Sequence, residues 1–219
     1  MTWQIFEEEA SRYEAWYATE RGRRADIAER ALLEWLLRQL PETRTVLEVG
    51  SGTGHFAARL VESGFQVIGL ERAPAMVKAA QRSFPSISFL LGDAHYLPLR
   101  GRAVDVVVFI TTLEFLARSA AALREAVRVA RRGVVVVALN RWSLGGLSRR
   151  FGAQSRRTLL GQANDYSLPR LRRELRDAAG ARLGSMPWSS TLFPDGLWNF
   201  SAPVPVGDVI GVAGSLNGK

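Results

Sequence analysis

The length and composition of the chain exclude several classes of protein. Its 219 residues, 47% of them apolar, suit one α/β domain with some decoration, and no apolar run reaches the ~18 residues of a membrane span. The absence of cysteine excludes disulfides, thiolate metal sites and a cysteine nucleophile, and we expect no metal. The N-terminal residues are acidic and lack the features of a signal peptide, so a cytoplasmic protein is the simplest expectation.

The chain is strongly basic, and almost all of its basic residues are arginine. The formal net charge is +8 and the sequence pI is about 10.8. Such a charge permits contact with nucleic acid or with anionic substrates. Because the arginines are scattered over most of the length, we interpret them as solvated helix faces and do not favour a nucleic-acid partner.

Residues 1–40 are expected to form a helical cap made of one or two amphipathic helices. The break between the two is predicted at residues 21–24, and the helical region should stop before Pro41. The apolar positions expected to face inward in the second helix are Ile27, Ala31, Leu32, Trp35 and Leu36.

A β-prone run at residues 45–49 leads into a glycine-rich turn and then into a helix at residues 55–62. Glycine permits positive φ and lets a ligand approach the backbone amides, and a helix N-terminus adds partial positive charge. The turn reads G-x-G-x-G, whereas a dinucleotide fingerprint reads G-x-G-x-x-G. Glu48, two residues before the first glycine, would repel a pyrophosphate but would suit a cation or an ammonium group.

This stretch, Glu-Val-Gly-Ser-Gly-Thr-Gly, resembles motif I of the class I S-adenosylmethionine-dependent methyltransferases. S-adenosylmethionine carries an ammonium, a carboxylate and a sulfonium but no phosphate, so its chemistry agrees with the turn. A glycine-rich turn without a ligand is the alternative. The residues of this stretch that the resemblance assigns to the cofactor are Glu48, Gly50, Ser51, Gly52, Thr53 and Gly54.

The next predicted strand, residues 65–70, ends at Glu71, which lies 21 residues after Gly50. A carboxylate at about that spacing, on the tip of the adjacent strand, can bind both hydroxyls of a ribose. The alternative is a helix-capping or surface glutamate. The following residues open a helix, and Arg72 or Met76 is a candidate for lining an adenine pocket.

A third strand at residues 87–91 runs into Gly-Asp-Ala-His-Tyr-Leu-Pro-Leu, residues 92–99. This resembles the G-D-A-x-x-L-P segment of the ubiquinone- and menaquinone-type methyltransferases. The resemblance implies that Asp93 accepts from the adenine amino group and that the Ala94 amide serves a ring nitrogen. An aspartate at a strand end can instead cap a turn. His95 is a candidate base, although a single loop histidine is more often structural.

The fourth strand, residues 104–110, is a continuous apolar run, as expected for a strand buried on both faces of a parallel sheet. It opens into Leu-Glu-Phe, where relatives commonly have a histidine. Glu114 either replaces that histidine as a base or is a salt-bridged surface residue. The resemblance also implies that the backbone of Ile110 and Thr111 lines the methionine part of the cofactor, and that an aromatic residue near Tyr13 reaches it.

Alternating strands and helices predict a doubly wound, mostly parallel sheet. The resemblance implies seven strands in the order 3-2-1-4-5-7-6, the seventh antiparallel. We expect a single domain with a cofactor-binding core at 41–139, a lid insertion at 140–167 and a C-terminal part at 168–219. The alternative for the insertion is a solvated cover that buries Trp142 and Leu147. In that part the sixth strand is predicted at 181–188 and the seventh at 204–213.

The sequence therefore predicts an S-adenosylmethionine-dependent methyltransferase that acts on a small-molecule acceptor by in-line displacement and releases S-adenosylhomocysteine. We expect a monomer or a homodimer. One alternative is an RNA or other macromolecule methyltransferase that uses the arginine-rich face. Another is a cofactor-binding protein that has lost catalysis.

Overall fold

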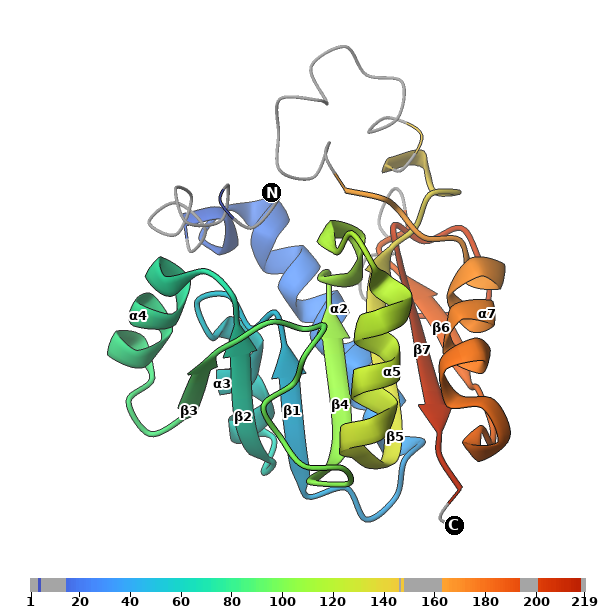
Figure 1. Ribbon diagram of the computed structural model, residues 1–219. Coiled ribbons are helices and arrows are strands. Elements are labelled where there is room, and N and C mark those ends of the chain that lie inside the picture. The colour runs from blue at the N-terminus through green and yellow to red at the C-terminus, as the bar shows by residue number, and fades with distance from the viewer. Residues whose placement is uncertain (1–3, 5–14, 146, 148–162, 194–200, 218–219) are drawn as a thin grey trace.

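A computed structural model describes residues 4, 15–145, 147, 163–193 and 201–217. Its centre is a seven-stranded sheet in the order β3-β2-β1-β4-β5-β7-β6, as predicted (Figure 1). The strands from β3 to β5 are parallel, and β7 is antiparallel to both β5 and β6. The strands are β1 (Thr45–Val49), β2 (Gln66–Glu71), β3 (Ser88–Leu91), β4 (Val104–Ile110), β5 (Ala130–Leu139), β6 (Trp188–Thr191) and β7 (Val209–Ser215).

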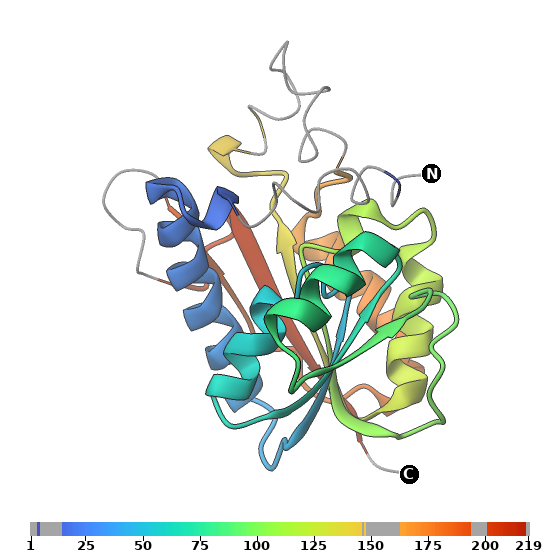
Figure 2. The same cartoon turned by 90° about the vertical axis from the view of Figure 1, so that its left-hand side faces the viewer.

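Helices cover both faces of the sheet and enclose two cores, one on each side (Figure 2). Helices α2 to α4 contribute to one core, and α5 and α7 to the other. Their bounds are α2 (Glu20–Arg38), α3 (His55–Glu62), α4 (Pro74–Ser83), α5 (Ser119–Val129) and α7 (Leu168–Ala179), with 3₁₀ turns η1 (Leu113–Phe115) and η4 (Gly180–Arg182). In the described part of the chain, no helix combines the length and apolarity needed to cross a membrane.

The central strand β4 explains why the sheet needs both layers. All seven of its residues are buried. Val106 and Val108 belong to the core under α2 and α3, whereas Val107 belongs to the core under α5 and α7. Successive side chains of a strand point to opposite faces, so an uninterrupted valine run is stable only if both faces are covered.

Helix α2 differs from the prediction in its start and in the face that it buries. It begins at Glu20 after the N-cap Thr19 and continues through residues 21–24, so the break lies just before it. Gly22 is buried, and a Cβ there would lie 2.0 Å from the Trp16 carbonyl oxygen, so only glycine allows the preceding turn to pack this closely. Ile27, predicted to face inward, is 53% exposed. The inward stripe includes Ala25, Ala28, Leu32, Leu33, Leu36 and Leu37.

The C-terminal strands also begin later than predicted. Residues 180–182 form η4, so β6 starts only at Trp188. The predicted start of the seventh strand falls on exposed residues, and β7 begins at Val209. Pro203 and Pro205 explain this shift, because proline has no N–H to donate to a strand ladder.

Strand β5 contains a glycine that the core requires. It begins at Ala130, so Gly133 lies within the sheet. A Cβ at Gly133 would lie 2.6 Å from Leu40 Cδ1, so glycine here makes room for a core leucine. After β5, Trp142 is 59% exposed and Leu147 is also exposed, so neither is buried as the alternative of a solvated cover required.

Candidate functional site

The glycine turn between β1 and α3 forms the floor of the candidate site. Gly50, Gly52 and Gly54 have φ of 75°, 52° and 88°, a region that favours glycine. The Gly50 amide donates to the Leu70 carbonyl oxygen at 2.7 Å, which ties the turn to the end of β2. A Cβ on Gly50 would lie 2.4 Å from Thr112 Cγ2, so the turn also touches the segment that follows β4.

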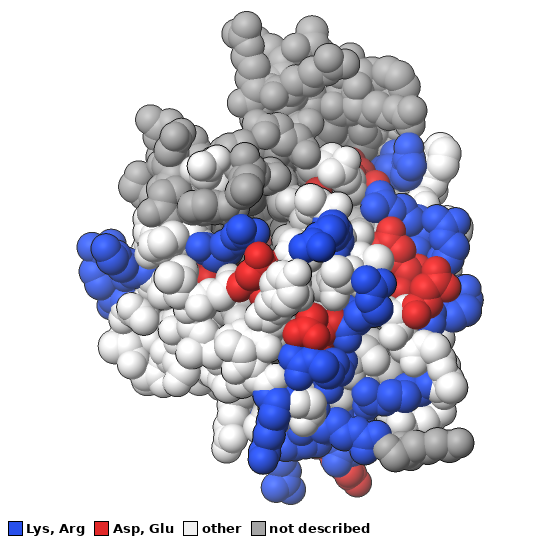
Figure 3. Space-filling model, viewed as in Figure 1, with Lys and Arg blue, Asp and Glu red and all other residues white. Residues whose placement is uncertain are grey.

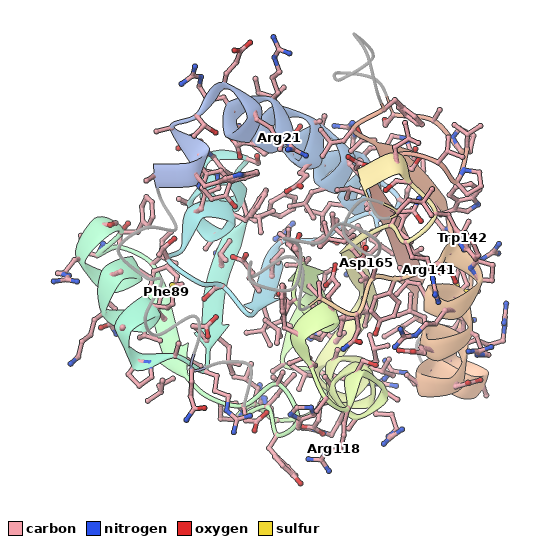
Figure 4. All side chains as sticks on the ribbon, turned by 90° about the horizontal axis from the view of Figure 1, so that it is seen from above. Arg21, Phe89, Arg118, Arg141, Trp142 and Asp165 are labelled. Carbon is pink, nitrogen blue, oxygen red and sulfur yellow. The ribbon has the colours of Figure 1, made fainter. Side chains whose placement is uncertain are left out.

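Phe89 on β3 closes the other side of the turn. A Cβ on Gly54 would lie 2.7 Å from Phe89 Cζ. Figure 4 looks onto this edge and shows Phe89 beside α4, whereas Trp142 lies on the side where α7 packs. The carboxyl ends of β1 to β4 therefore meet around a turn in which three of five residues are glycine.

Glu71 at the tip of β2 joins two of the predicted cofactor-binding segments. Its Oε2 accepts from the Gly52 amide at 3.0 Å, and its Oε1 accepts from the amides of Arg72 and Ala73 at 2.6 and 2.9 Å. The N-cap of α4, Ala73, has no capping side chain, so Glu71 supplies that function. A carboxylate has about four acceptor positions, so about one remains for a ligand.

Asp93, Arg72 and His95 form one network at the end of β3. Asp93 Oδ1 accepts from the His95 amide at 2.9 Å and lies 2.6 Å from His95 Nδ1, while Oδ2 pairs with Arg72 Nη1 at 3.1 Å. Burial acts to raise the pKa of Asp93, but the bonds from His95 and the charge of Arg72 together hold it below its usual value. His95 is thus oriented by Asp93. Met76 and Ala94, the other residues predicted near the adenine, are buried beside this network.

Two buried polar atoms near the glycine turn have no hydrogen-bond partner among the described residues. They are Glu48 Oε2 and Ser51 Oγ. Burial, with a contribution from the charge of Glu71, raises the pKa of Glu48 well above its usual value, although a bond from the Ala57 amide opposes this. An unsatisfied buried polar group costs about 1–3 kcal/mol. A ligand with an ammonium group and further donors would satisfy both atoms, so the donor set fits S-adenosylmethionine.

Glu114 lies in η1 at the end of β4 and is completely buried, with 0% exposure. The alternative of a salt-bridged surface residue is therefore wrong. Its Oε1 accepts from the Leu139 amide at 2.5 Å, which links η1 to the end of β5. The neighbouring Thr111 has φ of 47°, a strained conformation for a β-branched residue. Such strain is often found at functional sites. Ile110 is buried at the end of the same strand.

Sequence reasoning missed a group of ionisable residues that α2 brings to this edge. Asp26 Oδ1 lies 2.7 Å from His55 Nε2, and the His55 ring stacks on Tyr17 with centroids 3.8 Å apart. Glu29, one turn further along α2, is buried and feels the charges of Asp26 and Glu114. Asp26 and Glu29 fall on the same helical stripe as the inward alanines and leucines, but which stripe of α2 faces inward is decided by its packing.

Parts of the predicted site lie outside the described residues. These are Tyr13 and residues 148–162 of the lid insertion.

The doubly wound sheet, the glycine turn after β1 and the carboxylates at the ends of β2 and β3 define the class I S-adenosylmethionine-dependent methyltransferase fold. Residues 47–138 match the family Methyltransf_11, described as a methyltransferase domain. This part of the chain therefore carries a methyltransferase domain, and the fold is that of class I, the class whose cofactor is S-adenosylmethionine.

Known proteins agree with this assignment. Over 116 residues the chain is 35% identical to an uncharacterized methyltransferase of Mycobacterium bovis, covering 53% of this chain and 46% of that protein. Over 92 residues it is 34% identical to a malonyl-[acyl-carrier protein] O-methyltransferase of Yersinia pestis, covering 42% and 34%. The chain thus spans less than half the length of these curated relatives.

A solved structure matches over almost the whole chain. It is a SAM-dependent methyltransferase of Thermotoga maritima, described as a possible histamine N-methyltransferase. The TM-score is 0.82 with 26% identity, and the match covers 98% of this chain and 100% of that one.

Proposed function

We propose that the protein transfers a methyl group from S-adenosylmethionine to a small-molecule acceptor. The observation that carries this proposal is the contact between Glu71 and the Gly52 amide, because it joins the tip of β2 to the glycine turn at one edge of the sheet. S-adenosylmethionine supplies a methyl group activated by its sulfonium. The protein supplies binding, alignment and a dry surrounding.

We assign the cofactor contacts to groups with acceptor or donor capacity left over. Glu71 would accept from the ribose hydroxyls, and Asp93 would accept from the adenine amino group beside the Ala94 amide. Glu48, whose Oε2 is buried without a partner among the described residues, would accept from the ammonium group. The backbone of Ile110 and Thr111 would line the methionine part, and Thr53 and Ser51 would complete the turn.

For catalysis we favour Glu114 over His95 as the group nearest the acceptor. His95 Nδ1 is engaged by Asp93 at the end of β3, the strand farthest from β4 on this side of the sheet. Glu114 follows β4 directly, where the glycine turn meets Thr112. Related proteins do not decide the acceptor, because the Yersinia pestis relative is an O-methyltransferase and the Thermotoga maritima protein a possible N-methyltransferase.

A macromolecular acceptor is the second candidate, and the surface charges weigh against it. In the upper part and on the right of the face seen in Figure 3, arginines and carboxylates are interleaved, whereas basic residues predominate toward its lower edge. Many arginines pair with nearby acids, as in Arg128 with Glu125, Arg170 with Glu174 and Arg59 with Glu62. A continuous basic track is the usual footprint of a nucleic-acid surface. Submicromolar binding to RNA with a steep salt dependence would favour this candidate instead.

Calorimetric titration with S-adenosylhomocysteine, using NADH as the control ligand, tests the proposal. We expect micromolar binding of S-adenosylhomocysteine alone. Absence of such binding by a folded protein would contradict the cofactor assignment and, with it, the proposed activity. Binding without turnover on any acceptor would favour the third candidate, a cofactor-binding protein without catalysis.

A further inference from the structure

Helix α2 buries acidic groups where its leucine stripe approaches the candidate site. In the C-terminal half of α2 the inward positions are leucines. Glu29 lies about one turn before the first of these leucines, and Asp26 about two turns before it, and both are buried. Carboxylates are almost never buried unless they are paired. Asp26 meets this condition through His55, at 2.7 Å. Glu29 does not, and that difference needs a physical reason.

The Glu29 side chain is buried, and the described residues provide no partner for it. Its exposure is 8%, and within the described part of the chain no hydrogen bond or ion pair is found for its carboxyl group. Burial, followed by the charges of Asp26 and Glu114, raises the pKa of Glu29 to about 8. The charges of Asp26, on the same helix, and of Glu114, in η1, thus both act on the Glu29 carboxyl.

This group of acids lies near the glycine turn, which it approaches from two elements. His55, which holds Asp26, is the first residue of α3 and directly follows Gly54. Glu114 follows Thr112, whose side chain is in contact distance of a Cβ built on Gly50. The acids therefore approach the glycine turn from α2 and from η1, at the end of β4.

We propose that Asp26, Glu29 and Glu114 form the acceptor site and that the acceptor presents a protonated amine. This inference rests on the proposed function and specifies its substrate class. An ammonium group brings three donors and one positive charge to a place where a buried carboxyl lacks both.

Other ligands fit this group of acids less well. A carboxylate or phosphate would be repelled by it, and a hydroxyl would bring no positive charge to it. A divalent cation needs several ligands converging on one point. Among the described residues, no group of three or more His, Cys, Asp or Glu side chains is arranged to hold a metal ion.

The same acids can manage the proton of the reaction. The positive charge of the bound ammonium favours the ionised form of Glu29, whose own proton leaves to solvent. The ammonium then gives one proton to the Glu29 carboxylate and becomes a neutral amine. The amine nitrogen then forms a bond to the methyl carbon with its lone pair, while the bond from that carbon to sulfur breaks and its electron pair stays on sulfur. The product is a methylated ammonium ion beside the remaining carboxylates. Charge and atoms balance without any further reagent.

The test measures amine binding to protein saturated with S-adenosylhomocysteine, by calorimetry at pH 7. The probes are hexylamine, 2-phenylethylamine and 1,4-diaminobutane, each compared with the alcohol or diol of the same skeleton. We expect at least one amine to bind 10-fold or more tightly than its alcohol. Glu29→Gln should weaken that binding about 10-fold while leaving the affinity for S-adenosylhomocysteine within 2-fold.

Glu34→Gln is the matched control, because Glu34 lies on the same helix, is partly exposed and pairs only loosely with Arg38, at 4.0 Å. It should bind the amine like the wild type. If no amine binds better than its alcohol, or if Glu29→Gln binds the amine as the wild type does, the inference is wrong. The proposed function fails separately, by loss of binding to S-adenosylhomocysteine in the wild type. Gln has the shape of Glu, so Glu29→Gln should fold, which thermal unfolding verifies.

Discussion

Glu71 serves the fold and the candidate site with one carboxylate. Its Oε1 caps α4 through the amides of Arg72 and Ala73, and its Oε2 holds the Gly52 amide. The two alternatives of helix cap and ligand-binding residue are therefore not exclusive. Because three acceptor positions are used within the protein, the carboxylate is fixed before any ligand arrives, which lowers the entropy cost of binding.

We expect Glu71→Ala to weaken binding of S-adenosylhomocysteine by ~1–3 kcal/mol, the cost of losing charged hydrogen bonds. It should also lower the melting temperature, since α4 loses its cap. Glu71→Gln keeps one acceptor oxygen, so its affinity and its melting temperature should lie between those of the wild type and of Glu71→Ala. Calorimetry and thermal unfolding measure these effects. A folded Glu71→Ala protein with wild-type affinity would remove Glu71 from the site.

The titration of Glu29 makes stability depend on pH. The folded pKa of about 8 lies above the usual 4.5, so between these values the folded state binds more protons than the unfolded state. Stability therefore falls as the pH rises from about 4.5 to about 8. At about 1.4 kcal/mol per pKa unit, the total effect is several kcal/mol.

Glu29→Gln should remove this slope and raise stability at pH 8 more than at pH 5. Thermal unfolding of cofactor-free protein from pH 5 to 8.5 measures the difference between variant and wild type, so titration of other groups cancels. Glu34→Gln should run parallel to the wild type. An equal shift at both pH values would mean that Glu29 is ionised throughout this range.

At the scale of elements, the turn between β1 and α3 depends on glycine for two separate reasons, and the chain offers a comparison that separates them. Gly50 and Gly64 both have positive φ, 75° and 92°. A Cβ at Gly50 would clash with Thr112, whereas one at Gly64 would meet nothing within 4 Å. Gly64→Ala therefore isolates backbone strain, and Gly50→Ala adds the clash.

We expect Gly64→Ala to cost about 1–2 kcal/mol of stability, the penalty of a left-handed non-glycine residue, and to bind S-adenosylhomocysteine as the wild type does. Gly50→Ala should be less stable than Gly64→Ala and should bind at least 10-fold more weakly, because Thr112 anchors the segment after β4 through its bond to the Ile110 carbonyl oxygen. Thermal unfolding and calorimetry compare the two variants. Equal effects on binding would show that the contact with Thr112 is unimportant.

The elements that the sequence predicted well are those whose signals are local. A few neighbouring residues determine the conformation in each case: the glycine turn, Pro74 at the start of α4 and the valine run of β4. The inward face of α2 could not be predicted in the same way. Ile27 looks like a core residue and Glu29 like a surface residue, yet the packing of α2 against β5, β6 and β7 decides the opposite.

The residues of the candidate site also fall into two groups, those in local motifs and those brought together only by the fold. The residues predicted for the cofactor sit in contiguous motifs, so Glu71 and Asp93 were found from spacing and resemblance. The acids near the end of β4 come from α2 and η1, which are far apart in sequence and meet only through the fold. Whether Glu114 was buried or exposed depended on that meeting, so no local pattern could decide it.

At the scale of the whole molecule, the sheet is fastened at the end opposite the candidate site by Asp105. Its Oδ2 accepts from the amides of Arg44 and Thr45 at 3.0 and 2.9 Å, and its Oδ1 bonds Arg131 at 3.2 Å. One carboxylate thus joins the amino ends of β1, β4 and β5. Burial acts to raise the pKa of Asp105, but these bonds together lower it to about 2.

Because the folded pKa of Asp105 is below the usual 3.8, its contribution to stability is present above pH 3.8 and is lost as the pH falls through about 2. The shift corresponds to roughly 2 kcal/mol, so Asp105→Asn should lose about that much at pH 7 and show a flatter decline between pH 4 and 2. Asp177→Asn, at an exposed position of α7, is the control and should follow the wild type.

Thermal unfolding across this pH range measures both variants. Calorimetry should find unchanged binding of S-adenosylhomocysteine, since Asp105 joins the strands at the far end of the sheet. A wild-type acid profile for Asp105→Asn would show that the bonds of Asp105 do not stabilise the fold, and weakened binding would show that the two ends of the sheet are coupled.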